Sequence, residues 1–582
     1  MNKLLDYAKD NRLATVGAGT LGLYSFYKLS GYLGQAHCKK QLRNEIERAR
    51  ENRERGVQQL KKYLQAKLDK PGANRGETQR KWEHIVKLNL PELQKILQSG
   101  EVSAVEVLNA FQWSAIQAHM QTNCVTEFFM EAEDEARAMD VKYQSIGRKP
   151  PLFGIPISVK DNLEVKGHKS VCGMAQFLLH PVPTEDGLLV AGLRELGCVP
   201  FVHTNVPQTM MSIGCFNPVF GTTTHPQDKL RTCGGSSGGE GALLGLRGSP
   251  LGLGTDIAGS VRIPCHYNGL AGIKPTSGRG VGNKPVLKGV AMVSGTWGPM
   301  SKDVDSLVLF LQEIWIPDSP LFREVQMIPL TFQQDLYDTN RPLRIGFYMG
   351  ERGFEAVPAC QRAVLLAKRA LESRGHTLVP FAPAGNGLAA IHLFKAINLD
   401  GGRMFRRVLD QDIMEPLNAA FPHFSLTNWS YRLGRYFAWL LRFLWPRWAG
   451  YLDAMVVNTD QMRQANEDIA QFRADNIKAW RAADLDGVIC CAAVSAAPPH
   501  EDVARLFGVW SATCLYNEDE RKTAESYPAT MPLDEETRLV KAANSSGSLG
   551  LPIGVQCVTL PYRDELCLRL MKEVESGLQT MR

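Results

Sequence analysis

The sequence lacks the spacing that marks a zinc site. Its 13 cysteines are scattered through 582 residues, with no C-x-x-C pair and no Cys/His cluster at zinc-ligand intervals. Scattered cysteines of this kind are typical of reduced, buried thiols, which favours a catalytic domain in a reducing compartment. The chain also has no internal repeat, which excludes a repeat architecture.

A strong charge of one sign is absent as well. Lys and Arg total 66 and Asp and Glu total 60, a net charge of +6. A nucleic-acid-binding protein usually carries a stronger or more concentrated basic field, so no nucleic-acid partner is expected. The content of 44% hydrophobic and 22% charged residues excludes disorder as the main state. The length suggests either about two to four domains or one large α/β enzyme.

The N-terminal segment has no charged residue from position 13 to 27. As a helix, that stretch spans about 22 Å, and extension to Gly34 brings the span to about 33 Å, near the thickness of a bilayer core. Lys28, close to the end, can reach the membrane interface. The sequence therefore predicts a single transmembrane anchor over residues 1–37.

Two other interpretations of this segment stay open. Gly17, Gly19 and Gly22 form a G-x-G-x-x-G pattern, but the acidic residue of a dinucleotide site is missing about 20 residues later. A basic start before an apolar stretch also fits a cleaved signal peptide, although no small-x-small cleavage site follows. Basic residues are more numerous after the segment, which places the main chain in the cytosol. The charge-rich residues 38–84 predict a solvated helical connector.

Residues 85–580 alternate short apolar runs with helical stretches, which predicts an α/β catalytic domain with a mixed, twisted β-sheet core surrounded by helices. The predicted strands include residues 155–159, 199–203, 343–347 and 488–491. The predicted helices include residues 103–117, 131–143, 358–373 and 566–577. The Gly-rich centre at residues 221–300 is interrupted by apolar runs, so it indicates a backbone that approaches a ligand closely rather than a linker.

The segment at residues 429–452 contains four Trp and four Arg but no acidic residue. This composition favours a helical pair, broken near Pro446, that lies in a bilayer interface. Arg side chains then meet lipid phosphates while aromatic rings enter the acyl boundary. We therefore predict a membrane-binding cap on the catalytic domain, with a partner-protein surface or a core helix as alternatives.

Two motifs precede the centre of the chain. In LFGIPISVKDN (residues 152–162), Lys160 directly follows an apolar strand, although the motif alone also fits a surface lysine at a strand end. In GGSSGGEGA (residues 234–242), a glycine loop leads into a helix whose first N–H groups are free. Residues 235–239 also match G-x-S-x-G, the nucleophile elbow of α/β hydrolases. The elbow requires a buried strand directly before it and an HGGG-type oxyanion motif. This sequence shows neither.

The third motif, GLGTDIAGSVRIP (residues 252–264), places Ser260 in a tight turn of small residues. Taken alone, such a turn also fits a plain loop. Its backbone amides can converge on one anion and form an oxyanion hole. The candidate amides are those of Ile257, Ala258, Gly259 and Ser260.

Together, the order and spacing of the three motifs resemble the amidase signature family over roughly residues 85–575. GLAGIKPTSGR (residues 269–279) continues the family pattern. The resemblance implies a mixed β-sheet wrapped by helices and a Ser-Ser-Lys triad, with no metal or organic cofactor. By motif position, Ser260 is the nucleophile, Ser236 the bridging serine, which follows a cis peptide bond in the family, and Lys160 the base.

Two positions complicate this assignment. Ser237 competes with Ser236 as the bridge, and motif position favours Ser236. Ala258 stands where many members of the family have glycine. Because an oxyanion donor is a backbone N–H, the extra methyl group is harmless unless the residue requires a positive φ.

The chemistry of the side chains agrees with these roles. A serine hydroxyl is a poor nucleophile until a base removes its proton. Lysine has an ordinary pKa of about 10.4, and burial brings it toward neutrality. A lysine that collects this proton can return it through Ser236 to the leaving amine, which amide cleavage requires. The same arrangement also permits ester hydrolysis.

Within the family, the chain looks most like an animal, membrane-bound branch that hydrolyses fatty acid amides. The anchor and the cap carry this narrower resemblance, together with HTNVPQTMMS (residues 203–212) and LPIGVQCV (residues 551–558). It implies N-acylethanolamines and primary fatty amides as substrates. It also implies a homodimer on an internal membrane such as the endoplasmic reticulum. Met210 and Met211 then line the acyl path, although both also fit ordinary core filling.

Two alternatives remain for the function. A soluble amidase, or the amidase subunit of an amidotransferase, has the same fold but acts on small polar amides. A catalytically silent membrane scaffold is the alternative from a different class. The presence of all three candidate triad residues favours an enzyme.

Overall fold

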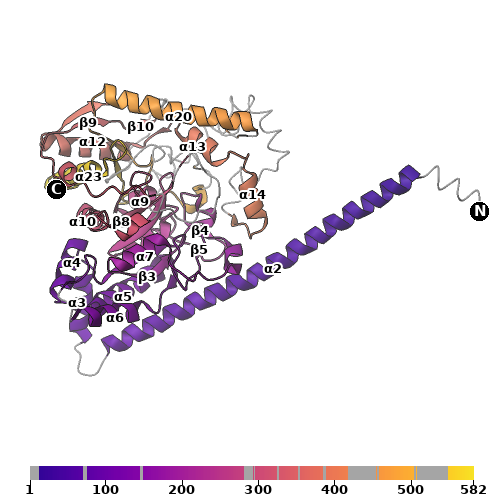
Figure 1. Cartoon of the computed structure of the whole chain (residues 1–582), viewed down its shortest axis with the longest axis horizontal. Coiled ribbons are helices and arrows are strands. Elements are labelled where there is room, and N and C mark those ends of the chain that lie inside the picture. Colours follow the sequence, from indigo (N-terminus) through magenta and orange to yellow (C-terminus); the bar gives the residue numbers. More distant parts are fainter. Residues whose placement is uncertain are drawn as a thin grey trace, which may run out of the picture.

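The computed structural model describes residues 12–69, 75–144, 148–280, 293, 295–323, 327–351, 354–384, 389–416, 454, 456, 458–503, 506 and 548–581, with the backbone alone for residues 12–37, 351, 354 and 355. The predicted cap at residues 429–452 lies outside them. Figure 1 shows a body of sheets and helices from which one long helix extends toward the N-terminus.

The larger sheet has six strands in the order β1-β3-β2-β6-β8-β7. Its central strands β3, β2 and β6 are parallel, whereas β1, β8 and β7 pair antiparallel with their neighbours. The central strands are buried along their whole length, as expected for parallel strands covered on both faces. The bounds are β1 (Val125–Phe128), β2 (Ile155–Lys160), β3 (Cys198–Thr204), β6 (Leu251–Asp256), β7 (Ala271–Gly272) and β8 (Thr296–Ser301).

A second sheet of four strands has the order β12-β9-β13-β14. Its first three strands are parallel, and β14 is antiparallel. The bounds are β9 (Arg344–Phe347), β12 (Thr377–Pro380), β13 (Gly487–Cys491) and β14 (Val555–Val558), and two small pairs are β4 (Phe216–Asn217) with β5 (Gly221–Thr222) and β10 (Gly350–Glu351) with β11 (Phe354–Glu355). The predicted α/β class is confirmed, but the described residues form two main sheets rather than one.

Helices surround both sheets (Figure 1). Helix α8 packs on the larger sheet over its central strands, and α12 and α23 pack on the smaller one. The α-helices are α2 (Arg12–Leu68), α3 (Arg75–Ile85), α4 (Leu90–Ser99), α5 (Ala104–Thr122), α6 (Ala132–Gln144), α7 (Leu188–Glu195), α8 (Gly238–Gly245), α9 (Arg262–Asn268), α10 (Val304–Ile314), α11 (Gln334–Tyr337), α12 (Pro358–Ser373), α13 (Ala389–Ile397), α14 (Arg403–Asp410), α20 (Thr459–Ala482) and α23 (Asp564–Thr580), and the short 3₁₀ helices are η1 (Ala175–Leu179), η2 (Gln208–Met210), η3 (Pro320–Arg323) and η4 (His500–Asp502).

Helix α2 corrects the prediction of a solvated connector. Its apolar side chains recur at helical spacing and are buried against the body, with Leu42 and Ile46 in one small cluster and Leu60 and Leu64 in the main core. Arg50 also donates to the Val219 carbonyl at 2.6 Å. The charge-rich sequence concealed this face because apolar residues are few along the helix and some of its charged side chains, such as Arg50 and Lys67, also bond to the body.

The predicted anchor is not confirmed by the fold. Residues 12–37 continue into α2 without a break, so the segment is the first part of a 57-residue helix. Within the described residues, no helix is both long enough and apolar enough to cross a bilayer. The thiol prediction is confirmed, because the described cysteines are free and most are buried.

Candidate active site

Lys160 is the last residue of β2 and lies between the parallel strands β3 and β6. Its side chain is completely buried, which excludes the surface lysine that the motif alone also allowed. The strand places it there because β2 is a central strand, covered by helices α5 and α8. A long polar side chain in such a position requires polar partners.

Those partners are hydroxyl and carbonyl oxygens, and not carboxylates. Lys160 Nζ donates to Ser236 Oγ at 2.8 Å, to Thr255 Oγ1 at 2.9 Å and to the Thr255 carbonyl at 3.1 Å. Burial lowers the pKa of Lys160 to about 7, and more distant acidic groups such as Asp256 only partly oppose the shift. A substantial fraction of the amine is therefore neutral near pH 7 and able to accept a proton.

Ser236 is the serine that the lysine contacts. It is buried in the loop before α8, and the peptide bond between Gly235 and Ser236 is cis. A Cβ atom at Gly235 would lie 2.4 Å from the Ser212 carbonyl oxygen, so only glycine fits before this serine. Ser237 is buried too, but its Oγ has no partner among the described atoms. The contacts therefore favour Ser236 over Ser237 as the bridge.

The nucleophile-elbow alternative does not fit this loop. An elbow serine sits on a sharp turn directly after a buried strand. Here the residues before Gly235 form turns and isolated bridges, such as the pairing of Thr224 with Thr232. Helix α8 does begin at Gly238, as the sequence predicts.

The turn that carries Ser260 follows β6 directly and is held by Asp256. The Asp256 carboxylate accepts hydrogen bonds from the Gly259 amide at 2.7 Å and the Val261 amide at 3.0 Å. It also accepts two bonds from the Arg262 guanidinium, at 2.8 and 3.0 Å. Burial alone would raise the pKa of Asp256, but Arg262 and the amides hold it below its ordinary value. The sequence prediction missed this carboxylate, although it stands inside the GTDIAGS motif.

Ser260 itself is half-buried at the end of this turn. Its carbonyl oxygen accepts a hydrogen bond from the Ser237 amide at 3.0 Å, which joins the two candidate loops side by side. The three motifs predicted to act together therefore do meet, at the carboxyl ends of β2 and β6.

The predicted oxyanion amides are not all available. Because the Gly259 N–H donates to Asp256, it is not aimed at an external anion. The substitution at Ala258 is compatible with the turn, since the positive φ of 120° falls on Gly259 and not on the alanine. The expected convergence of four amides is thus corrected for Gly259, while Ile257, Ala258 and Ser260 remain candidates.

A second buried carboxyl lies beside the lysine. Glu240, in the first turn of α8, accepts hydrogen bonds from Ser158 Oγ and from Thr204 Oγ1. Ser158 lies two residues before Lys160 on the same face of β2, and Thr204 is the register partner of Lys160 on β3. Burial raises the pKa of Glu240 to about 7. This contact ties α8 to the sheet beside Lys160, and the sequence prediction missed it.

Met210 and Met211 are half-buried, at η2 and directly after it. The Gln208 side chain ties this turn to residues 413–415. Its Nε2 donates to the Ile413 carbonyl at 2.8 Å, and its Oε1 accepts from the Glu415 amide at 3.0 Å. The proposed acyl path beside the methionines stays a prediction.

Comparison with known proteins places these features in context. The family model described as Amidase matches residues 106–568. The chain is 37% identical over 570 residues to fatty acid amide hydrolase 1 of Caenorhabditis elegans, with 94% of this chain and 96% of that protein covered. It is 35% identical over 561 residues to fatty-acid amide hydrolase 1 of Sus scrofa, with 92% and 93% covered.

More distant similarities extend this pattern. An acetamidase of Emericella nidulans is 30% identical over 526 residues, with 84% of this chain and 89% of that protein covered. A solved structure of a fatty acid amide hydrolase superposes with a TM-score of 0.75 at 24% identity, covering 92% of this chain and 95% of that chain. The superposition shows that the fold is shared.

Proposed function

Because this chain belongs to the amidase signature family and is an amide-hydrolysing enzyme, we propose that it is a serine hydrolase that cleaves fatty acid amides to a fatty acid and an amine. In this proposal Ser260 is the nucleophile, Ser236 the bridge and Lys160 the base. The observation that carries it is the buried Lys160 amine, 2.8 Å from Ser236 Oγ, with a pKa lowered to about 7.

The reaction follows from that proton path. Neutral Lys160 accepts the Ser236 hydroxyl proton while Ser236 accepts the proton of Ser260, whose oxygen attacks the amide carbon. The proton then returns through Ser236 to the amide nitrogen, the C–N bond breaks and the amine leaves. Water next attacks the acyl ester on Ser260, and the same relay takes its proton. The fatty acid leaves and Ser260 is restored.

The negative charge on the carbonyl oxygen needs donors that are in place before reaction. We assign this role to backbone amides of the turn after β6. Since the Gly259 amide donates to Asp256, the donors in this proposal are Ile257, Ala258 and Ser260. Asp256 acts indirectly, because it fixes the shape of the turn that presents them.

The substrate class separates the proposed function from its alternative. The similarity to two relatives named fatty acid amide hydrolases, over most of the chain, supports fatty amides as substrates. The similarity to a protein named acetamidase, at 30% identity, supports the alternative of small amides. Each methylene group removed from water contributes about 0.8 kcal/mol, so an acyl pocket discriminates strongly by chain length.

We expect purified protein to hydrolyse N-palmitoylethanolamine and oleamide with a kcat/KM about 100-fold or more above that for acetamide. The measurement is the rate of amine or ammonia release at several substrate concentrations. The Ser260→Ala variant, purified in the same way, serves as the blank. An equal or higher kcat/KM for acetamide would replace the fatty-amide proposal with the small-amide alternative.

We also propose that the chain works at a membrane. The apolar stretch within residues 1–37 and the basic-aromatic segment 429–452 support this proposal through their composition. The catalytic domain then faces the cytosol on an internal membrane, as a homodimer, and receives its lipid substrate from the bilayer.

Deletion of residues 1–37 is expected to leave a protein that still floats with liposomes, because the segment at 429–452 retains apolar and cationic side chains. Flotation through a density gradient measures this, with the full chain as reference. A second variant carries Arg435→Glu and Arg442→Glu in the truncated chain and should lose flotation. If the truncated chain stays with the free protein instead, residues 429–452 are not a membrane-binding cap.

A further inference from the structure

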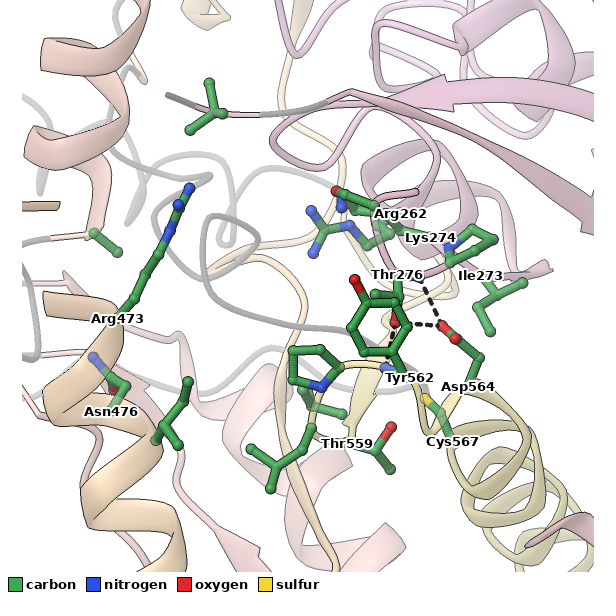
Figure 2. Close-up of a pocket in the computed structure, with 18 of the residues that line it drawn as sticks. Arg262, Ile273, Lys274, Thr276, Arg473, Asn476, Thr559, Tyr562, Asp564 and Cys567 are labelled. Carbon is green, nitrogen blue, oxygen red and sulfur yellow. Dashed lines mark hydrogen bonds between the residues drawn. The ribbon is translucent and has the colours of Figure 1, made fainter. Parts of the chain in front are cut away.

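A cavity of about 630 Å³ lies next to the turn that carries Ser260, and the proposed mechanism assigns no ligand to it. Its walls come from the stretch after β7, from α13 and α20, and from β14 leading into α23 (Figure 2). Ile257 and Arg262, three and two residues from Ser260, line it as well. Its volume lies within the range of sites for small molecules.

Three cationic side chains face this cavity. Lys274 and Arg262 lie on one wall, and Arg473 extends from α20 on the opposite side (Figure 2). Two described acidic groups nearby, Asp256 and Asp564, are bound to arginines. Asp256 accepts two hydrogen bonds from Arg262, and Asp564 accepts one from Arg279 at 2.9 Å. Among the described lining residues, three cations therefore stand against one carboxylate, that of Asp564.

Lys274 is the cation that this arrangement affects most. The described carboxylates whose charges act on its amine are Asp256 and Asp564, and both also accept hydrogen bonds from arginines. Burial is the main cause that lowers the pKa of Lys274 to about 8. The charges of Arg262 and, more weakly, Arg473 add to the lowering, and the carboxylates of Asp256 and Asp564 partly oppose it. Cations that face one another across a cavity repel, and an anion between them offsets that cost.

The remaining lining is largely apolar. Helix α20 contributes Ile469, Phe472 and Ile477. The end of β14 contributes Val558, and the stretch after it contributes Leu560. The lining also contains one buried polar atom, His392 Nδ1, that has no hydrogen bond among the described atoms. A ligand that fits must combine an anionic head with an apolar body.

We propose that this cavity binds a long-chain carboxylate, with its head between Lys274 and Arg473 and its chain along the apolar wall of α20. The proposed function supplies such an acid at Ser260, so the source of the ligand rests on that function. The binding site itself does not depend on it. After hydrolysis, the fatty acid can move from Ser260 into this cavity. The enzyme then retains its own product.

Binding is tested on the full chain with Ser260 blocked by a long-chain fluorophosphonate, which also fills the acyl path. Palmitate is titrated below its micelle concentration and followed by calorimetry. We expect Lys274→Met and Arg473→Gln each to raise the Kd of palmitate about tenfold, since each removes a charge-assisted contact. Arg463→Gln, an exposed arginine on the same helix, is the matched control and should leave Kd unchanged.

The pH dependence gives a second readout. Because Lys274 loses its proton as the pH rises through about 8, palmitate should bind the blocked wild type more weakly at pH 9 than at pH 7. The Lys274→Met variant should lack this change. Hexadecanol, which has the same chain without the charge, should bind equally to wild type and both variants.

A photoreactive palmitate locates the ligand. Crosslinks in residues 459–482 or 555–567 support the cavity, and crosslinks confined elsewhere overturn it. Equal Kd values in wild type, Lys274→Met and Arg473→Gln overturn it too. If unblocked protein hydrolyses fatty amides while blocked protein does not bind palmitate, only this inference fails. If palmitate binds but no fatty amide is hydrolysed, the proposed function fails and the site stands.

Discussion

Replacement of Ser260 with alanine is expected to lower kcat for amide hydrolysis by about 10⁵- to 10⁶-fold, because loss of a serine nucleophile removes the covalent route. The fold should be unaffected, since the turn is held by Asp256 and by the Ser260 carbonyl rather than by its hydroxyl. Steady-state kinetics and labelling with a fluorophosphonate measure the two consequences. The variant should take up no label.

Ser237→Ala is the matched control for that experiment. Its hydroxyl is buried and has no partner among the described atoms, so its removal breaks no known hydrogen bond. We expect labelling and kcat within a few-fold of wild type. If the label is instead found on Ser237 in the wild-type protein, Ser260 is not the nucleophile and the elbow interpretation returns.

The second large effect concerns Lys160. Replacement by alanine is expected to lower amide kcat about 10³- to 10⁴-fold but ester kcat only about 10²-fold at neutral pH. The difference arises because an amide needs its leaving nitrogen protonated, whereas an alcohol leaves more easily. Parallel assays of an oleoyl amide and the matched oleoyl ester measure the ratio. Equal losses on the two substrates would argue against proton return through Ser236.

The pH profile tests the same residue independently. Burial lowers the pKa of Lys160 to about 7, and the base is active only when neutral. The wild-type kcat/KM for amides should therefore rise with pH through about 7 and level above it. Lys160→Met, which keeps much of the side-chain volume, should lose this limb. Lys166→Met, an exposed lysine shortly after the strand, is the control and should keep it.

Much of the fold follows from local sequence. The helix predicted at residues 358–373 is observed with the same bounds, because Pro358 suits the first helical position and the apolar residues recur at helical spacing. The strand predicted at 155–159 is observed as Ile155–Lys160. Helix α5 starts where Ser103 caps it by accepting the Glu106 amide. These signals are local, so neighbouring residues suffice to produce them.

Other features depend on segments far apart in the chain. The separation into two sheets follows from pairings such as β9 with β13, whose strands lie more than a hundred residues apart. The buried face of α2 exists because the 3₁₀ helix η1, the strand β1 and the helix α5 lie against it. The cavity beside the catalytic turn likewise needs the stretch after β7, α20 and β14 together. The spacing of apolar residues predicts each strand or helix, but it does not predict which other element that strand or helix packs against.

The three candidate motifs and their order are read from the sequence alone, and with them the family and its amide-hydrolysing activity. Which serine meets the lysine was decided only in three dimensions, where Nζ reaches Ser236 and not Ser237. The state of Lys160 was decided there as well. A lysine at a strand end is cationic in water, and the pKa of Lys160 falls to about 7 because β3, β6 and α8 enclose its side chain and exclude solvent.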